Sequence, residues 1–80
     1  MTEIEEWKRK RVTGVVLEYM RGRKPRADLN WCIGCLTKSF GLSLSEINLL
    51  IESIEKDPTV IRTTERDERL RLLKEKLKEI

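Results

Sequence analysis

Two cysteines are the residues of this chain with the most obvious chemical potential. They lie in the segment Trp31-Cys32-Ile33-Gly34-Cys35. A Cys-x-x-Cys pair at a helix N-terminus can exchange disulfides, because the helix dipole lowers the pKa of the first thiol. The same spacing also occurs in metal sites. The spacing of the two cysteines is therefore compatible with two kinds of chemistry, thiol redox exchange and metal binding.

The redox interpretation rests on a resemblance of this pentapeptide to the thioredoxin active site, where a strand precedes the motif. Here the preceding segment, residues 26–30, is typical of a loop and a helix cap. Cys32 also shares helical spacing with Leu29, Leu36 and Phe40, which places it on a buried face. We therefore expect Cys32 to be a core residue and Cys35 to lie at the flank of that face. A redox pair or disulfide remains the alternative.

A structural zinc site requires four ligands. The chain supplies two Cys and no His, so an all-thiolate site would close only if two subunits each contributed both cysteines. We expect no metal and no cofactor.

Catalysis is not expected either. Without His the chain lacks the usual general base and the usual partner of a nucleophilic Ser or Cys. Its glycines are too scattered to form a phosphate-binding loop, and 80 residues form one small domain, which we take as residues 1–80.

Positive charge is concentrated in segments, although 17 Lys and Arg stand against only 14 Asp and Glu. Residues 8–11 are Lys-Arg-Lys-Arg, and residues 21–26 are Arg-Gly-Arg-Lys-Pro-Arg. Such runs are often only a solvated surface. A helix would spread residues 8–11 around its axis, whereas the 21–26 cluster is dense and has no interleaved acid. The 21–26 cluster is therefore the better candidate for binding phosphates.

Three helices are predicted to position these residues. The first carries an apolar stripe that includes Val12, Val16 and Tyr19 and ends at Gly22. The second, over 29–40, is capped by Asp28 and ends at Gly41. The third, over 44–56, begins with a capping box formed by Ser43 and Glu46 and ends at Asp57-Pro58.

The C-terminal third allows two interpretations. Residues 59–64 are rich in β-branched side chains and residues 69–72 alternate in polarity, which favours a hairpin with its loop at 65–68. A short helix would follow from about Leu73. The alternative is one helix from near Asp67, because Leu70, Leu73, Leu77 and Ile80 also form a helical stripe and the helix propensity of 67–80 is high. We expect the hairpin.

This order of elements resembles the winged helix-turn-helix superfamily. The matching parts are the helix over 29–40, the turn over 40–43, the helix over 44–56 and the hairpin over 59–72 as the wing. The predicted fold is thus mainly α with a small β-hairpin. The resemblance implies nucleic-acid binding, with the third helix in the major groove and the wing beside the backbone.

The outward face of the third helix departs from that pattern, because none of its residues is basic. Only Asn48 could read a base edge there, whereas Glu46 and Glu52 would repel phosphates. We therefore expect backbone-dominated, weakly specific binding, most naturally to duplex DNA, through basic residues elsewhere. The candidates besides Asn48 are Arg21, Arg23, Lys24, Arg26, Lys38, Arg62, Arg66, Arg69 and Arg71.

The runner-up hypothesis is a protein-interaction or dimerisation adaptor. It would use the helix over 44–56, with its outward Leu49, and the C-terminal leucine stripe. Trp7 and Trp31 are expected to be partly buried in the core. Aromatic residues do not alternate with basic ones, which argues against a groove for stacked single strands.

Residue usage completes the expectations. The chain has no apolar run long enough for a membrane span, and its N-terminus does not look like a signal peptide, so we expect a cytoplasmic protein. The absence of Gln and the abundance of Lys, Arg and Glu resemble hyperthermophile usage.

Overall fold

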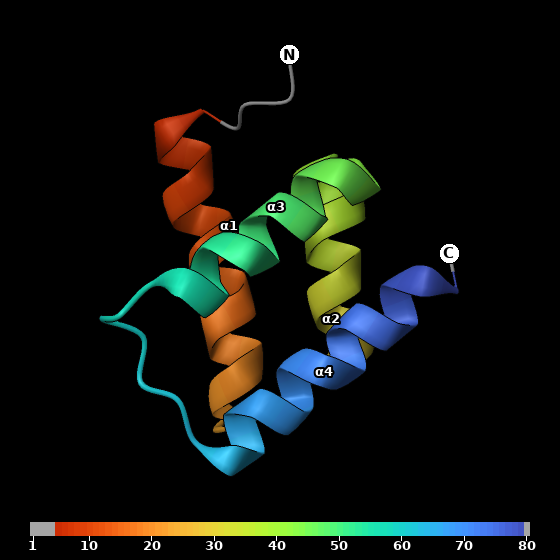
Figure 1. The fold of residues 1–80 in the computed structure, drawn as a ribbon. Helices are drawn as coiled ribbons and strands as arrows, with labels where there is room; N and C mark the ends of the chain where they lie inside the picture. The colour runs from red at the N-terminus through yellow and green to blue at the C-terminus, as the bar shows by residue number, and fades with distance from the viewer. Residues whose placement is uncertain (1–4, 80) are drawn as a thin grey trace.

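The chain folds into four α-helices, with a short π-helix extending the second. This computed structural model describes residues 5–79. Along the chain the elements are α1 (Glu6–Arg21), α2 (Leu29–Gly34), η1 (Cys35–Ser39), α3 (Leu44–Lys56) and α4 (Thr64–Lys78). In Figure 1, α1 and α2 lie side by side, and α3 and α4 cross them toward opposite ends. Helix α1 contacts every other helix and is therefore the centre of the fold.

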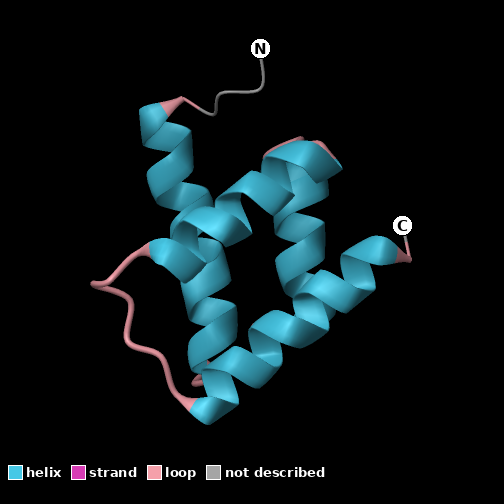
Figure 2. Cartoon of the chain, viewed as in Figure 1, coloured by secondary structure: helices cyan, strands magenta, loops and turns pink. Residues whose placement is uncertain are grey.

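The predicted wing is wrong. Residues 5–79 contain no strand, and the segment expected to form the hairpin is a connecting loop followed by α4 (Figure 2). Because the hairpin was the part that distinguished a winged helix from other helical folds, the winged helix-turn-helix assignment is corrected to an all-helical bundle. The alternative of one long helix is confirmed, although the helix begins at Thr64, three residues before the predicted Asp67.

Capping and burial explain why this segment is helical. The Thr63 side chain caps α4 by accepting a hydrogen bond from the Arg66 backbone N–H at 3.1 Å. The helix then buries Leu70, Leu73 and Leu77 on one side. A strand over 69–72 would have buried Leu70 with Leu72, whereas the helix leaves Leu72 exposed. The β-branched residues at 59–61 lie in a loop that begins with a turn, in which the Val60 N–H donates to the Asp57 carbonyl at 3.2 Å, and they pair with no strand.

The loop between α1 and α2 has the predicted ends. Gly22 adopts φ +65 after the last turn of α1, a conformation that L-residues rarely accept. The Asp28 side chain caps α2 by accepting from the Trp31 backbone N–H at 2.8 Å. The basic segment 21–26 is thus held between two well-defined helix termini.

The turn into α3 was also predicted correctly. Gly41 has φ +63, and Ser43 and Glu46 form the expected capping box. The predicted helix over 29–40 is continuous through α2 and η1, and its last turns are wound as a π-helix, with Phe40 N–H donating to the Cys35 carbonyl. Leu42 is buried immediately after this turn.

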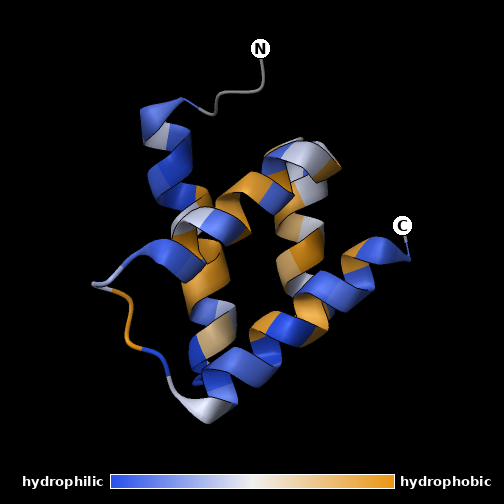
Figure 3. Cartoon of the chain, in the orientation of Figure 1, coloured by the Kyte–Doolittle hydropathy of each residue, from blue (hydrophilic) through white to orange (hydrophobic). Residues whose placement is uncertain are grey.

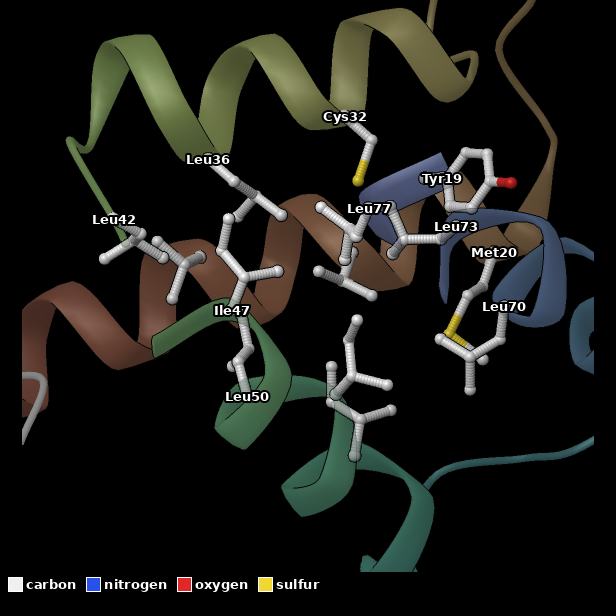
Figure 4. Packing of buried hydrophobic residues seen from close by; sticks show 14 residues of the cluster. Tyr19, Met20, Cys32, Leu36, Leu42, Ile47, Leu50, Leu70, Leu73 and Leu77 are labelled. Carbon is white, nitrogen blue, oxygen red and sulfur yellow. The ribbon is translucent and has the colours of Figure 1, made fainter. Parts of the chain in front are cut away.

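The core lies where the four helices meet. Figure 3 shows apolar residues concentrated on the facing sides of the helices, and Figure 4 shows their side chains converging. Every helix contributes, and no polar or charged residue of the described chain is buried. The buried cluster comprises Val12, Val16, Tyr19, Met20, Cys32, Leu36, Leu42, Ile47, Leu50, Ile51, Ile54, Leu70, Leu73 and Leu77.

Candidate nucleic-acid interface

Two of the four arginines assigned to the predicted wing stabilise the connection into α4. Arg62 forms an ion pair with Asp67 and donates to the Glu55 carbonyl at 3.2 Å. Arg66 donates to the Ile61 carbonyl at 3.0 Å. Both guanidinium groups therefore hold the 57–63 loop against its neighbouring helices.

Arg69 joins α4 to the end of α1. Its Nε donates to the Tyr19 carbonyl at 2.7 Å, and its guanidinium lies 4.8 Å from the centre of the Tyr19 ring. The Tyr19 hydroxyl in turn donates to the Arg69 carbonyl at 2.6 Å. A carbonyl in the last turn of a helix has no intrahelical partner, so this arginine completes the C-terminus of α1. Arg69 is a structural residue.

Arg71 lies on the outer side of α4 among acids. It forms ion pairs with Glu68 and with Glu75, the latter at 2.8 Å. The hydrogen bond from Arg71 lowers the pKa of the Glu68 carboxyl below its usual value. Lys74 pairs with Glu55 at 2.8 Å on the same side. These charges compensate one another and leave no net basic surface for phosphates.

The 21–26 segment differs, because most of its charge is uncompensated. Arg21, Arg23 and Arg26 are exposed, and none of them forms an ion pair with any residue in the range 5–79. Lys24 is the exception, since it pairs with Glu18 at 3.2 Å. Three guanidinium groups within six residues therefore face solvent.

A groove adjoins this segment, between the end of α1 and the start of α4. It has a volume of about 620 Å³, and Arg21, Arg66 and Arg69 line it together with Thr63 and Thr64. Glu65 and Glu68 line it as well, but Glu68 is already paired with Arg71. Guanidinium and hydroxyl donors at a helix N-terminus bind anionic groups such as phosphate.

The remaining two candidates lie apart from this groove. Lys38 is exposed near the end of η1, and the whole of α2 and most of η1 separate it from the 21–26 segment along the chain. Asn48 is exposed on α3. The outward face of α3 has no basic residue except Lys56 at its last position. Glu46 does not project toward a ligand as expected, because its carboxylate accepts from the Ser43 N–H at 2.9 Å. Helix α3 is therefore not the basic surface of the molecule.

The cysteines occupy the predicted positions. Cys32 is fully buried, Cys35 is partly buried, and they form no disulfide. Burial raises the pKa of the Cys32 thiol to about 12, the opposite of what a redox nucleophile requires. Among the described residues, no group of three or more His, Cys, Asp or Glu side chains could hold a metal ion.

Sequence reasoning missed two features. The groove could not be predicted, because it joins residues about 45 positions apart and depends on α4 being a helix. Trp7 was expected to be partly buried, yet it is 60% exposed. Its spacing to Lys10 and Arg11 is a signal that could have placed all three on one outer face of α1.

Comparisons with known proteins identified no relative. No family model, no curated protein and no solved structure matches the chain. Within residues 5–79, none of the helices has the length and apolar character needed to cross a bilayer.

Proposed function

We propose that this protein binds nucleic acid through the phosphate backbone, with weak sequence specificity and with duplex DNA as the natural ligand. The contact surface is the 21–26 segment together with the adjoining groove between α1 and α4. One observation carries the proposal: Arg21, Arg23 and Arg26 have no carboxylate partner among the described residues, whereas Arg62 and Arg71 do.

The charge distribution supports phosphate contacts over base readout. Exposed guanidinium groups release counterions from a polyanion when they bind, and this supplies sequence-independent affinity. The outward face of α3 offers Ser45, Asn48 and Glu52, which are too few and too acidic to read a sequence. Backbone contacts of this kind position a protein without specifying a site.

A charge-matched pair of variants tests the proposal. R21Q/R23Q/R26Q removes the three exposed arginines and lowers the net charge from +3 to 0. K56Q/K76Q/K78Q lowers it equally at sites away from the groove. Fluorescence anisotropy with a blunt duplex at low salt should show that R21Q/R23Q/R26Q loses affinity by about tenfold or more. K56Q/K76Q/K78Q should lose much less affinity.

Three outcomes separate the possibilities. A larger loss in the arginine variant supports the site. Equal losses in both variants would show that only net charge matters and would reject it. No binding by the unmodified protein at low salt would reject nucleic-acid binding altogether.

The runner-up hypothesis loses its main support. Leu70, Leu73 and Leu77 are buried in the chain's own core, and Ile80 lies outside the described residues. On α3, the outward Leu49 is exposed, but single exposed leucines are common on protein surfaces. No observation favours a dimer or a partner protein over nucleic acid.

A further inference from the structure

The first turns of α1 extend beyond the core. Val12 is the first buried residue of this helix, and none of residues 6–11 is buried. Figures 1 and 3 show this end projecting from the bundle with an almost entirely hydrophilic surface. Trp7 is the one large apolar side chain there. Exposing an indole forgoes the stabilisation that burial would give, and the projecting turns gain little from packing.

Trp7 belongs to a basic stripe along the outer face of α1. Residues separated by three, four or seven positions share a helix face. This spacing aligns Trp7 with Lys10, Arg11 and Gly14, and the same face continues to Arg21 at the end of the helix. The stripe therefore leads from the exposed indole to the proposed phosphate-binding segment.

The acid on this face is already compensated. Glu18 lies between Gly14 and Arg21, but one of its oxygens pairs with Lys24 at 3.2 Å and the other is buried. By contrast, Lys10 and Arg11 form no ion pair with any residue from 5 to 79. The stripe is thus net positive along its length.

Within residues 5–79, the Trp7 side chain is 60% exposed, so most of its indole can meet a flat ligand. The indole N–H donates to Glu5 at 2.6 Å, which orients the ring. Glu5 and Glu6 place two carboxylates nearby, and Lys10 and Arg11 set two cations against them on the face of Trp7. One turn past Arg11, nothing packs within 4 Å of the position that a Cβ on Gly14 would occupy, so the face is open at this residue.

We propose that Trp7 stacks on an unpaired base of a single-stranded tail adjoining the bound duplex. Lys10 and Arg11 contact the phosphates of the tail, while Arg21 and the 21–26 segment hold the duplex. A single exposed aromatic beside cations can stack on one base, because every base has a π-face, without the series of alternating aromatics that a longer stacking groove needs and this chain lacks. A membrane surface fits less well, since membrane-binding helices present several apolar residues and this stripe presents one.

This inference rests on the proposed function and defines its ligand more closely. Trp7 and Arg21 lie about 21 Å apart along α1, from 1.5 Å per residue. At the 3.4 Å rise per nucleotide of a fully stacked strand, a tail of about six nucleotides reaches this distance, and a less stacked tail reaches it with fewer. We therefore expect a preference for duplexes with a tail of about this length over blunt duplexes.

The test compares a blunt duplex with the same duplex carrying an oligothymidine tail of about six nucleotides, on either strand. W31F leaves Trp7 as the sole tryptophan. Its emission should be quenched by the tailed duplex and hardly changed by the blunt one. The tail should raise affinity at least about fivefold, and W7A should remove that gain while leaving blunt-duplex affinity unchanged. The affinities of W7A are compared with those of the unmodified protein, which both retain Trp31, so any damage caused by W31F does not affect this result.

The outcomes distinguish this inference from the proposed function. Blunt-duplex binding that depends on Arg21, Arg23 and Arg26, with no tail preference and no quenching, overturns the inference alone. Absence of all binding overturns both. A Trp7 emission shift with anionic phospholipid vesicles but not with the tailed duplex would identify a lipid surface instead, and would also overturn the inference.

Discussion

At the scale of single residues, the same side-chain type has different roles at different positions. Arg69 hydrogen-bonds the end of α1, Arg71 lies between two carboxylates, and Arg23 has no carboxylate partner in the described chain. A count of basic residues cannot separate these roles. Only the partners of each guanidinium group show which arginines are available for a ligand.

Replacing Arg69 by Met should destabilise the protein by about 2 kcal/mol. The substitution removes a charge-assisted hydrogen bond to the Tyr19 carbonyl and leaves that helix terminus without its partner. Arg71→Met is the matched control, since it breaks only exposed ion pairs and should cost less than about 1 kcal/mol. Urea unfolding monitored by circular dichroism measures both, and equal costs would contradict the structural role of Arg69.

The two thiols should react at very different rates. At pH 8 an alkylating reagent should modify Cys35 readily and Cys32 only slowly, because Cys32 is buried and its pKa is raised to about 12. Mass spectrometry of the C32S and C35S variants measures each thiol separately. Fast modification of Cys32 in folded protein would show that it is accessible and contradict the structure.

The raised pKa also predicts how stability depends on pH. An unfolded thiol loses its proton near pH 8.5, whereas the folded Cys32 thiol retains it up to about 12. Ionisation in the unfolded state therefore favours unfolding, and stability falls as pH rises above about 8.5. The C32S variant should lack this contribution.

At the scale of elements, local signals predicted the first two-thirds of the fold. Capping residues and glycines at φ near +65 determine helix ends through contacts within four residues, so Asp28, Ser43 and Gly22 could be interpreted from sequence alone. The hairpin prediction for residues 59–72 failed because β-branched residues also occur in loops, and short alternation of polar and apolar residues also occurs in helices. In this segment, the packing of α4 against α1 and α2 determines that the chain is helical.

Two leucines next to each other in α4 test the helical assignment. Leu73→Ala should cost roughly 2–5 kcal/mol because Leu73 is fully buried. Leu72→Ala should cost less than about 1 kcal/mol, since Leu72 is 40% exposed. In the predicted hairpin the alternating residues Leu70 and Leu72 would share the buried face. A large cost at Leu72 in thermal or urea unfolding would therefore contradict the helix.

The candidate site was predictable only in part. The density of arginines at 21–26 and the absence of acids among them are visible in the sequence, and the structure keeps that cluster exposed. The roles given to Arg62, Arg66, Arg69 and Arg71 depended on a wing that does not exist. Of these four, only Arg69 owes its contact to the packing of α4 against α1, which no local pattern encodes. Arg71 pairs with acids one turn away inside α4, and Arg62 and Arg66 contact carbonyls or an acid at the ends of the 57–63 loop, once α4 forms as a helix.

At the scale of the whole molecule, charge is compensated on one side and uncompensated on another. Glu55, Arg62, Asp67, Arg71 and Lys74 lie around one hollow between the end of α3 and α4, where opposite charges alternate. The outer face of α1 and the 21–26 segment have no such balance. The modest net charge of +3 therefore understates the basic surface that a polyanion would meet.

The most direct test of nucleic-acid binding through the 21–26 segment is the salt dependence of its affinity. The logarithm of the association constant for a blunt duplex should fall linearly with the logarithm of salt concentration. If Arg21, Arg23 and Arg26 each contact one phosphate, R21Q/R23Q/R26Q should make that slope shallower by about 2.7, from 0.9 per contact. K56Q/K76Q/K78Q should leave the slope nearly unchanged. A slope that is the same in the unmodified protein and in R21Q/R23Q/R26Q would contradict the proposed interface.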